Sequence, residues 1–212
     1  PVTQLSASKI KTAKNCSWKY YAIYHLHIPE KANSGASMGS CSHYVLECLA
    51  RSKWNDYVTK ILKEDDPFCI KSVERLIRKH AVRENVFDDE SVEKIKLFIL
   101  NGLKSDFYGE ARGKPAHTFT EKSFSIKNDR YNIRGFIDRL FIYEDGHAVI
   151  RDYKSSKETY KGEDISFNVQ AIIYCLAVRE MFPHVKSVSV EFLFLKFDCA
   201  LESEWKTGIY QG

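Results

Sequence analysis

The spacing of apolar residues changes once along this 212-residue chain, and the change falls near Pro115. Before Pro115, apolar residues recur about every 3.6 positions, as on a helix with one buried face. After it they alternate or form short runs, as in strands with one or two buried faces. The first part therefore predicts helices at residues 6–24, 36–52, 71–82 and 89–108. The second part predicts strands at 117–126, 131–143, 147–154 and 185–197, and a helix at 166–181.

The order of these elements indicates the class of fold. Three strands follow one another closely and suit an antiparallel meander, whereas the helix before the last strand suits a crossover between parallel strands. We expect an α/β fold (α+β mixed), in which helices flank a mixed central β-sheet and a helical N-terminal half precedes it. No long linker or internal repeat appears, so we expect a single domain over 1–212, mainly helical over 1–115 and sheet-containing over 116–212.

Hydropathy, charge and cysteine content indicate an intracellular protein that does not span a membrane. No apolar run approaches the roughly 18 residues of a membrane span, and Lys9, Lys11 and Lys14 interrupt any signal peptide. The six cysteines are scattered, so we expect reduced thiols in an intracellular protein of the cytoplasm or nucleoid. Residues 1–60 carry eight Lys and Arg against three Asp and Glu, interleaved with the aromatic residues Trp18, Tyr20, Tyr21 and Tyr24. That segment suits a polyanion with stackable bases, or else a solvated helix face above a buried aromatic stripe.

An acid and a lysine lie two positions apart in the strand 147–154. Side chains alternate along a strand, so Asp152 and Lys154 share one face, roughly 6.5 to 7 Å apart. On the preceding strand, Asp138 lies among apolar residues of its own face. Unpaired buried carboxylates are costly, and two on adjacent strands make each other harder to ionise. A divalent cation between Asp138 and Asp152 would remove both problems.

Simple ion pairs are the alternative for these acids. Asp152 could pair with Lys154, and Asp138 with one of the arginines Arg134, Arg139 and Arg151. Alternation weakens part of this alternative, because Arg139 and Arg151 face away from the acids on their own strands. The residues alone leave the choice between a cation and ion pairs open.

Two helices add polar side chains at one-turn spacing. Gln170 and Tyr174 lie four residues apart, so they share the helix face that we expect on the sheet. A buried glutamine must find hydrogen-bond partners, whereas one at the helix edge can bond to water. His43 and Glu47 have the same spacing in the first half, where a structural role for His43 is the alternative to a role as a ligand.

Five short stretches resemble the RecB-like branch of the PD-(D/E)XK nuclease superfamily, which is related to the lambda-type exonucleases. They are the N-terminal LSASKIKTAKNCSWKYYAIYHLHIPE, the G-x-x-x-H stretch MGSCSHYVLE, the G-x-x-D-R stretch GFIDRL, the D-x-K stretch RDYKSS and the Q-x-x-x-Y stretch QAIIY. They occur in the family's order and span residues 5–174, so together they are specific although each alone is weak. The resemblance implies a restriction-endonuclease-like core and metal-dependent cleavage of DNA.

The resemblance also implies a metal site at matching positions. His43, Asp138 and Asp152 would bind the metal, and the backbone carbonyl of Tyr153 would be a further ligand. Mg²⁺ or Mn²⁺, as one ion or two, suits carboxylates combined with one imidazole.

Other matching positions imply catalytic and supporting roles. Lys154 would be the catalytic lysine beside the acids Asp138 and Asp152. Gln170 and Tyr174 would support the site and the DNA, and Glu121 would take a supporting role.

Two features of parts of the family are missing. Some members hold an iron–sulfur cluster with one early cysteine and three near the C-terminus. Cys16 matches the early one, but no C-terminal triplet follows, so we expect no cluster and expect Cys16 to be a core thiol. No G-x-x-x-x-G-K-[ST] loop appears either, so nothing predicts ATP binding of that kind.

The sequence therefore favours a Mg²⁺- or Mn²⁺-dependent deoxyribonuclease, with an exonuclease preferred to an endonuclease. The expected partner is DNA that is single-stranded or has free ends, no membrane partner is expected, and an oligomer or a larger recombination complex stays open. DNA repair, recombination, phage DNA processing and CRISPR spacer acquisition are all compatible. The alternatives are a non-catalytic DNA-binding module on the same fold and an α/β domain whose acids are structural.

Overall fold

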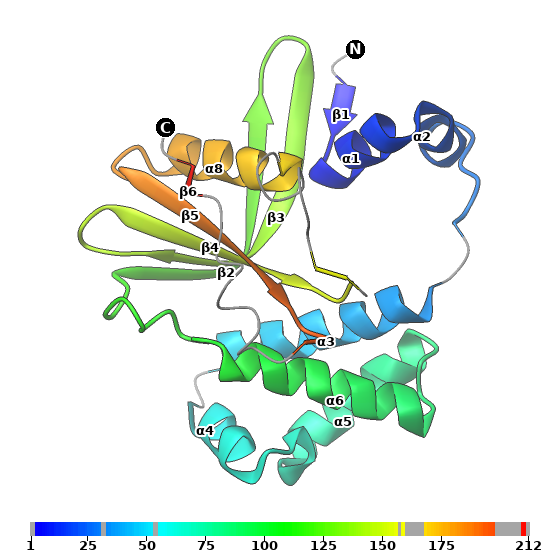
Figure 1. Ribbon diagram of the computed structural model, residues 1–212, viewed down its shortest axis with the longest axis vertical. Helices are drawn as coiled ribbons and strands as arrows, with labels where there is room; N and C mark the ends of the chain where they lie inside the picture. Colours follow the sequence, from blue (N-terminus) through cyan, green and yellow to red (C-terminus); the bar gives the residue numbers. More distant parts are fainter. Residues whose placement is uncertain are drawn as a thin grey trace.

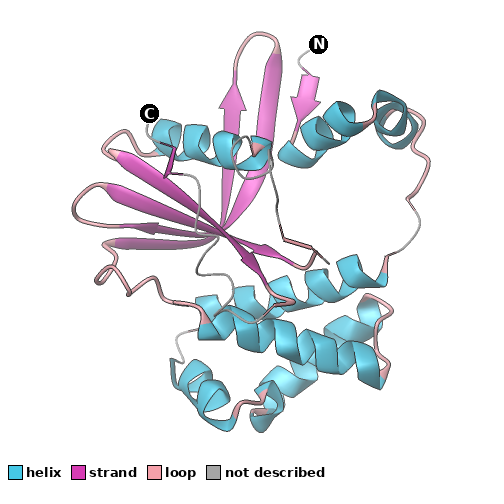
Figure 2. Ribbon diagram, viewed as in Figure 1, coloured by secondary structure: helices cyan, strands magenta, loops and turns pink. Residues whose placement is uncertain are grey.

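A β-sheet lies between helices on both of its faces in this protein (Figures 1 and 2). The computed structural model describes residues 3–30, 33–52, 55–156, 158–159, 168–197 and 209–210. Helices dominate the N-terminal half, and most of the sheet comes from the second half. The predicted mixed α/β fold with a helical N-terminal half is confirmed.

The helices of the first half are α1 (Ala7–Asn15), α2 (Ser17–Tyr24), α3 (Ser34–Arg51), α4 (Asn55–Glu64), the 3-10 helix η1 (Pro67–Cys69), α5 (Lys71–Arg83) and α6 (Asp89–Lys104). Side chains at their starts explain where several begin. Ser6, Asn33 and Asp88 accept hydrogen bonds from backbone N–H groups in the first turns of α1, α3 and α6. The predicted helices at 36–52, 71–82 and 89–108 are confirmed, although α6 ends earlier, at Lys104.

Two predictions about this half are wrong. The helix predicted over 6–24 is interrupted at Cys16, whose backbone is extended (φ −161, ψ 106). Cys16 Sγ accepts a hydrogen bond from the Lys19 backbone N–H at 3.4 Å and thereby caps α2. Cys16 is exposed rather than a core thiol, because α1 and α2 bury none of their residues. Helix α4 was not predicted, although its buried Val58 and Ile61 are three residues apart.

The strands are β1 (Thr3–Leu5), β2 (His117–Lys127), β3 (Tyr131–Ile142), β4 (His147–Lys154), β5 (Ser187–Phe194) and β6 (Ile209–Tyr210). Their order in the sheet is β1-β3-β4-β5-β6, and β2 also pairs with β3. The pairs β2–β3 and β3–β4 are antiparallel, so the predicted meander is confirmed. Strand β5 runs parallel to β4 after the helix α8 (Val169–Met181), as the crossover predicted. Residues 166 and 167 of the predicted helix lie outside the described residues.

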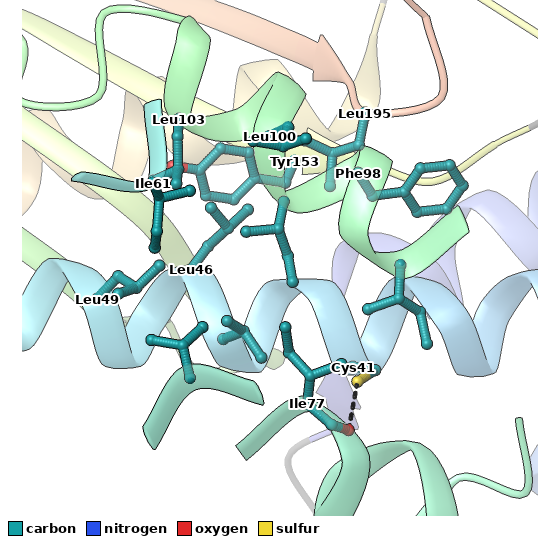
Figure 3. Packing of buried hydrophobic residues seen from close by; sticks show 14 of the residues in the cluster. Cys41, Leu46, Leu49, Ile61, Ile77, Phe98, Leu100, Leu103, Tyr153 and Leu195 are labelled. Carbon is teal, nitrogen blue, oxygen red and sulfur yellow. Dashed lines mark hydrogen bonds between the residues drawn. The ribbon is translucent and has the colours of Figure 1, made fainter. Parts of the chain in front are cut away.

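Apolar residues cover the two faces of the sheet separately. One cluster joins α3, α4, α5 and α6 to Tyr153 and Leu193 on one face (Figure 3). The other joins α8 to Leu140 and Ile150 on the opposite face. Because side chains alternate along β4, Asp152 faces α8 while its neighbour Tyr153 faces α3 and α6. The end of β4 therefore presents polar groups to helices on both sides.

Candidate active site

Two carboxylates lie together where β3 and β4 separate. The antiparallel register ends at the pair Arg139–Arg151, and Asp138 and Asp152 are the next residues on the two strands. Asp152 is 3% exposed, and the side chain of Asp138 is 15% exposed. Alternation places both on the face that α8 covers, because Leu140, two positions after Asp138, and Ile150, two positions before Asp152, belong to the cluster that contains α8.

The carboxylate of Asp152 is held by three side chains. Its Oδ1 accepts hydrogen bonds from Gln170 Nε2 at 2.9 Å and from the Tyr174 hydroxyl at 2.8 Å. Its Oδ2 lies 2.5 Å from Lys154 Nζ, which also donates to Gln170 Oε1 at 2.7 Å. Gln170 and Tyr174 can act together because they lie one turn apart on α8, where Gln170 Nε2 also donates to the Tyr174 hydroxyl at 2.7 Å. Gln170 is partly buried, and its side chain finds all of these hydrogen-bond partners within the site.

The carboxylate of Asp138 faces the backbone of β4 and the helix α3. Its Oδ2 accepts a hydrogen bond from the Tyr153 backbone N–H at 2.8 Å and lies 3.5 Å from His43 Nδ1. The His43 ring also meets the Tyr153 ring edge-on, with centroids 5.7 Å apart. Gly39 lets α3 approach this closely, since a Cβ at that position would lie 2.1 Å from Ser155 Oγ. The G-x-x-x-H spacing thus has a steric cause, because the glycine makes room one turn before the histidine.

The neighbouring arginines take no part in holding these acids, as alternation predicted. Arg151 Nε and Nη2 donate to Glu191 Oε2 at 2.9 and 2.8 Å. Arg139 is 2% exposed, with its guanidinium 4.6 Å from the ring centroid of Phe107 and 5.1 Å from that of Phe141. One of the predicted ion pairs does form, between Asp152 and Lys154. This pair is the alternative to a shared cation that the residues alone left open, and the catalytic role expected of Lys154 stays a prediction.

Burial and charge shift the proton affinities of the site. Burial, and then the Asp152 carboxylate, raises the pKa of Asp138 well above its ordinary value, although the Tyr153 backbone N–H and Lys154 oppose the rise. Burial lowers the pKa of His43 even though Asp152 acts to raise it. The 3.5 Å contact of His43 with Asp138 therefore involves a neutral imidazole rather than a cation. Such an imidazole keeps a lone pair for a ligand.

A cleft of about 960 Å³ opens onto this site. His43, Tyr153 and Lys154 line it, together with Glu47 and Glu121. Glu121 lies on β2 with φ of +51, and burial raises the pKa of its carboxyl, with further contributions from Glu47 and Asp152. No role at the site was predicted for Glu47, although it lies one turn after His43 on the same helix face. Glu121 thus lies close enough to help raise the pKa of Asp138, and Glu47 close enough to help raise that of Glu121.

Comparison with known proteins gives the chain its family. The sequence profile of the PD-(D/E)XK nuclease superfamily matches residues 4–207. The chain belongs to the PD-(D/E)XK nuclease superfamily. A comparison with curated proteins finds no significant match. The solved structures that match include a crystal structure from Eubacterium rectale described as a "putative exonuclease", with 11% identity, a TM-score of 0.54, and coverage of 89% of this chain and 67% of that one.

Membership of this nuclease superfamily implies a phosphodiester hydrolase with a nucleic acid substrate, and it supports the fold described above. It also makes a divalent metal the typical cofactor. The donor atoms fit such a metal, because the Asp152 carboxylate helps to raise the pKa of Asp138, and a cation between the two acids would offset that repulsion. Among the described residues, however, no group of three or more His, Cys, Asp or Glu side chains is already arranged to hold an ion. The Asp152 carboxylate is instead engaged by Lys154, Gln170 and Tyr174.

The structure brings most of the predicted site residues of this nuclease together at one end of β4. Asp138, Asp152, His43 and Lys154 are linked by contacts through Tyr153 and α8, and Glu121 lies within their electrostatic reach. The roles that the resemblance implied for them stay predictions. Within the described part of the chain, no helix is both long enough and apolar enough to cross a membrane.

Proposed function

We propose that this member of the superfamily is a divalent-metal-dependent deoxyribonuclease. The observation that carries the proposal is the pair Asp138 and Asp152 at the point where β3 and β4 separate, with Lys154 two residues beyond Asp152. Burying two acids side by side destabilises the metal-free protein, and the raised pKa of Asp138 expresses that cost. A structural role alone would not require the second acid.

Asp138, Asp152, His43 and the backbone carbonyl of Tyr153 are the groups that we propose hold Mg²⁺ or Mn²⁺. When bound, such an ion supplies Lewis-acid chemistry, since it polarises a phosphoryl oxygen and acidifies a water. The neutral imidazole of His43 suits this task because it does not repel a cation. The Tyr153 backbone fixes the orientation of Asp138 through the 2.8 Å hydrogen bond to Oδ2.

Lys154 has a separate task, to stabilise charge on the phosphate. Its ammonium lies 2.5 Å from Asp152 Oδ2 and donates to Gln170 Oε1 at 2.7 Å. In catalysis the Lys154 ammonium would donate to a phosphate oxygen, where negative charge grows in the transition state. Gln170 keeps the amine within the site. Gln170 and Tyr174 also hold the Asp152 carboxylate in one orientation.

We further propose that cleavage starts from DNA ends. The support is the family resemblance together with the matching fold of the "putative exonuclease" from Eubacterium rectale. DNA repair, recombination, or phage and CRISPR DNA processing would each provide such ends.

A time course with Mn²⁺ or Mg²⁺ on end-labelled single-stranded DNA, end-labelled duplex and a closed circle tests the proposal. We expect mononucleotides or short products from the linear substrates, and an intact circle. Lys154→Met and Asp152→Asn should abolish cleavage, while the matched control Lys127→Met, at an exposed lysine of β2, should cleave as the native protein does. Equal cleavage by native protein and Lys154→Met would show the assignment to be wrong. Binding of DNA without cleavage under any metal condition would instead favour a non-catalytic DNA-binding module.

A further inference from the structure

The helix α2 exposes a row of aromatic rings on one face. Trp18 is 70% exposed and Tyr21 is 45% exposed, and His25 just after the helix is exposed as well. The rings of Trp18 and Tyr21 stack with centroids 5.9 Å apart and planes 27° apart, and those of Tyr21 and His25 stack at 5.4 Å and 21°. Spacings of three and four residues place all three on the same side of the helix. We call Trp18, Tyr21 and His25 the aromatic ladder.

The other two tyrosines of α2 serve a different side of the helix. Tyr20 and Tyr24 are only partly exposed, and their rings are tilted at 49° with centroids 5.0 Å apart. Lys9 Nζ from α1 lies 5.2 Å from the centroid of the Tyr24 ring. These tyrosines therefore pack the two short helices together, whereas the ladder is directed to solvent. Large exposed aromatic rings in a row mark a surface with a binding role.

The charge of this segment indicates what the ladder binds. Residues 3–30 contain the single acid Glu30, which pairs with Lys19 at 2.7 Å, against four lysines, Lys9, Lys11, Lys14 and Lys19. A second copy of the chain would bring the same positive charge to the contact and be repelled. A polyanion that carries flat aromatic groups is attracted to both features. Single-stranded nucleic acid has this chemistry, and duplex DNA does not expose its base faces.

The ladder is attached to both helices that supply side chains to the candidate site. Ala7 and Ile10 of α1 pack against the cluster that contains Tyr174 of α8. The next helix after α2 along the chain is α3, which carries Gly39 and His43. The ladder is therefore connected to the site through α1, which packs on both α2 and α8.

We propose that the aromatic ladder binds single-stranded nucleic acid by stacking on its bases, while the lysines around it contact the phosphates. The inference rests on the proposed nuclease function for the identity of the strand, which is the segment adjoining the cut. It refines that function, since it makes a single-stranded segment part of the substrate. The ladder contributes to the affinity for single-stranded nucleic acid without sequence specificity, because every base has a face that stacks.

Binding of fluorescein-labelled oligo(dT) of about 15 nucleotides, in EDTA to prevent cleavage, tests the ladder. Trp18→Ala and Tyr21→Ala should each weaken binding by roughly 5- to 100-fold, the range expected for losing one base stack. Phe87→Ala is the matched control, because Phe87 is an aromatic residue with 60% exposure outside this segment, and it should bind as the native protein does. Unchanged circular dichroism of the variants would show that the exposed rings do not support the fold.

Two further measurements separate stacking from charge. An abasic strand of the same length should bind native protein and Trp18→Ala equally, because it has no bases to stack. Lys14→Gln should lower the slope of log affinity against log salt by about 0.7, while Trp18→Ala should leave that slope unchanged.

Several results would overturn the ladder. One such result is that Trp18→Ala and Tyr21→Ala bind oligo(dT) as tightly as the native protein does. Another is that Trp18→Ala loses as much affinity for the abasic strand as it loses for oligo(dT). A native dimer in sedimentation that becomes monomeric in Trp18→Ala would assign the surface to a second copy instead. If the native protein cuts DNA and the ladder variants bind oligo(dT) as tightly as it does, the proposed role of the ladder is wrong and the proposed nuclease function stands. If the ladder variants lose affinity for oligo(dT) as expected but no metal supports cleavage, the proposed nuclease function is wrong and the role of the ladder stands.

Discussion

Replacing Gly39 by alanine tests how closely α3 must approach the end of β4. An added Cβ would lie 2.1 Å from Ser155 Oγ and 2.7 Å from Ser155 Cβ. Rotation of the serine hydroxyl relieves the first contact but not the second, so the helix itself must move by several tenths of an ångström. His43 follows one turn later on α3, and its Nδ1 therefore moves relative to Asp138.

The expected effects on stability and on cleavage differ in size. Overpacking costs about 1–3 kcal/mol, whereas alanine favours a helix interior over glycine by about 1 kcal/mol. The net loss in the free energy of unfolding is therefore about 0–2 kcal/mol. Cleavage should fall further, by up to about 100-fold, because that is the loss expected for a catalytic group displaced by about 1 Å and the shift of His43 is a sizeable fraction of it.

Urea unfolding and initial cleavage rates with Mn²⁺ measure the two effects. Ser155→Gly removes both clashing atoms, so the double variant Gly39→Ala/Ser155→Gly should recover most of the lost rate, and Ser155→Gly alone is the control. Native cleavage by Gly39→Ala, or a double variant no faster than Gly39→Ala, would refute this account of the close approach.

Three other predictions concern the acids and their partners. Because the folded protein holds the Asp138 proton more tightly than the unfolded chain, its contribution to stability is complete below about pH 4 and is lost as pH rises through the raised pKa. Metal-free Asp138→Asn should therefore resist urea better than native protein at neutral pH and equally below about pH 4, and a constant difference across pH would contradict this. Tyr174→Phe removes the 2.8 Å hydrogen bond to Asp152 and should cost about 1–3 kcal/mol in urea unfolding, so a smaller loss would mean that Gln170 suffices. Arg151→Met leaves the partly exposed Glu191 without its partner and should lower the free energy of unfolding by about 3 kcal/mol, whereas unaltered stability would show that the ion pair contributes nothing.

Much of this site could be predicted because it follows from local periodicity. Alternation along β3 and β4 correctly places Asp138 and Asp152 on the face opposite to Arg139 and Arg151, and helical spacing correctly joins Gln170 to Tyr174. What the sequence could not decide was the choice among partners. Lys154 Nζ lies 2.5 Å from Asp152 Oδ2. This contact depends on the side-chain rotamer of Lys154, which the spacing along a strand does not determine.

Other features depended on contacts between distant segments. Glu47 helps to raise the pKa of Glu121 because α3 contacts β2 in the folded protein. No local sequence pattern predicts this contact. The break at Cys16 was missed because no proline or glycine marks it, and the three-residue β1 is too short to show a period. The sequence likewise does not show that Trp18 is directed to solvent and Tyr20 toward α1, because this depends on how α1 packs on α2.

We propose above that Asp138 and Asp152 together bind one divalent cation. Calorimetric titration of Mn²⁺ into native protein, Asp138→Asn and Asp152→Asn tests it without any need for DNA cleavage. The account predicts saturable Mn²⁺ binding by native protein and a loss of affinity of about tenfold or more in each variant. Absence of Mn²⁺ binding to the native protein, or equal affinity in Asp138→Asn, would contradict it.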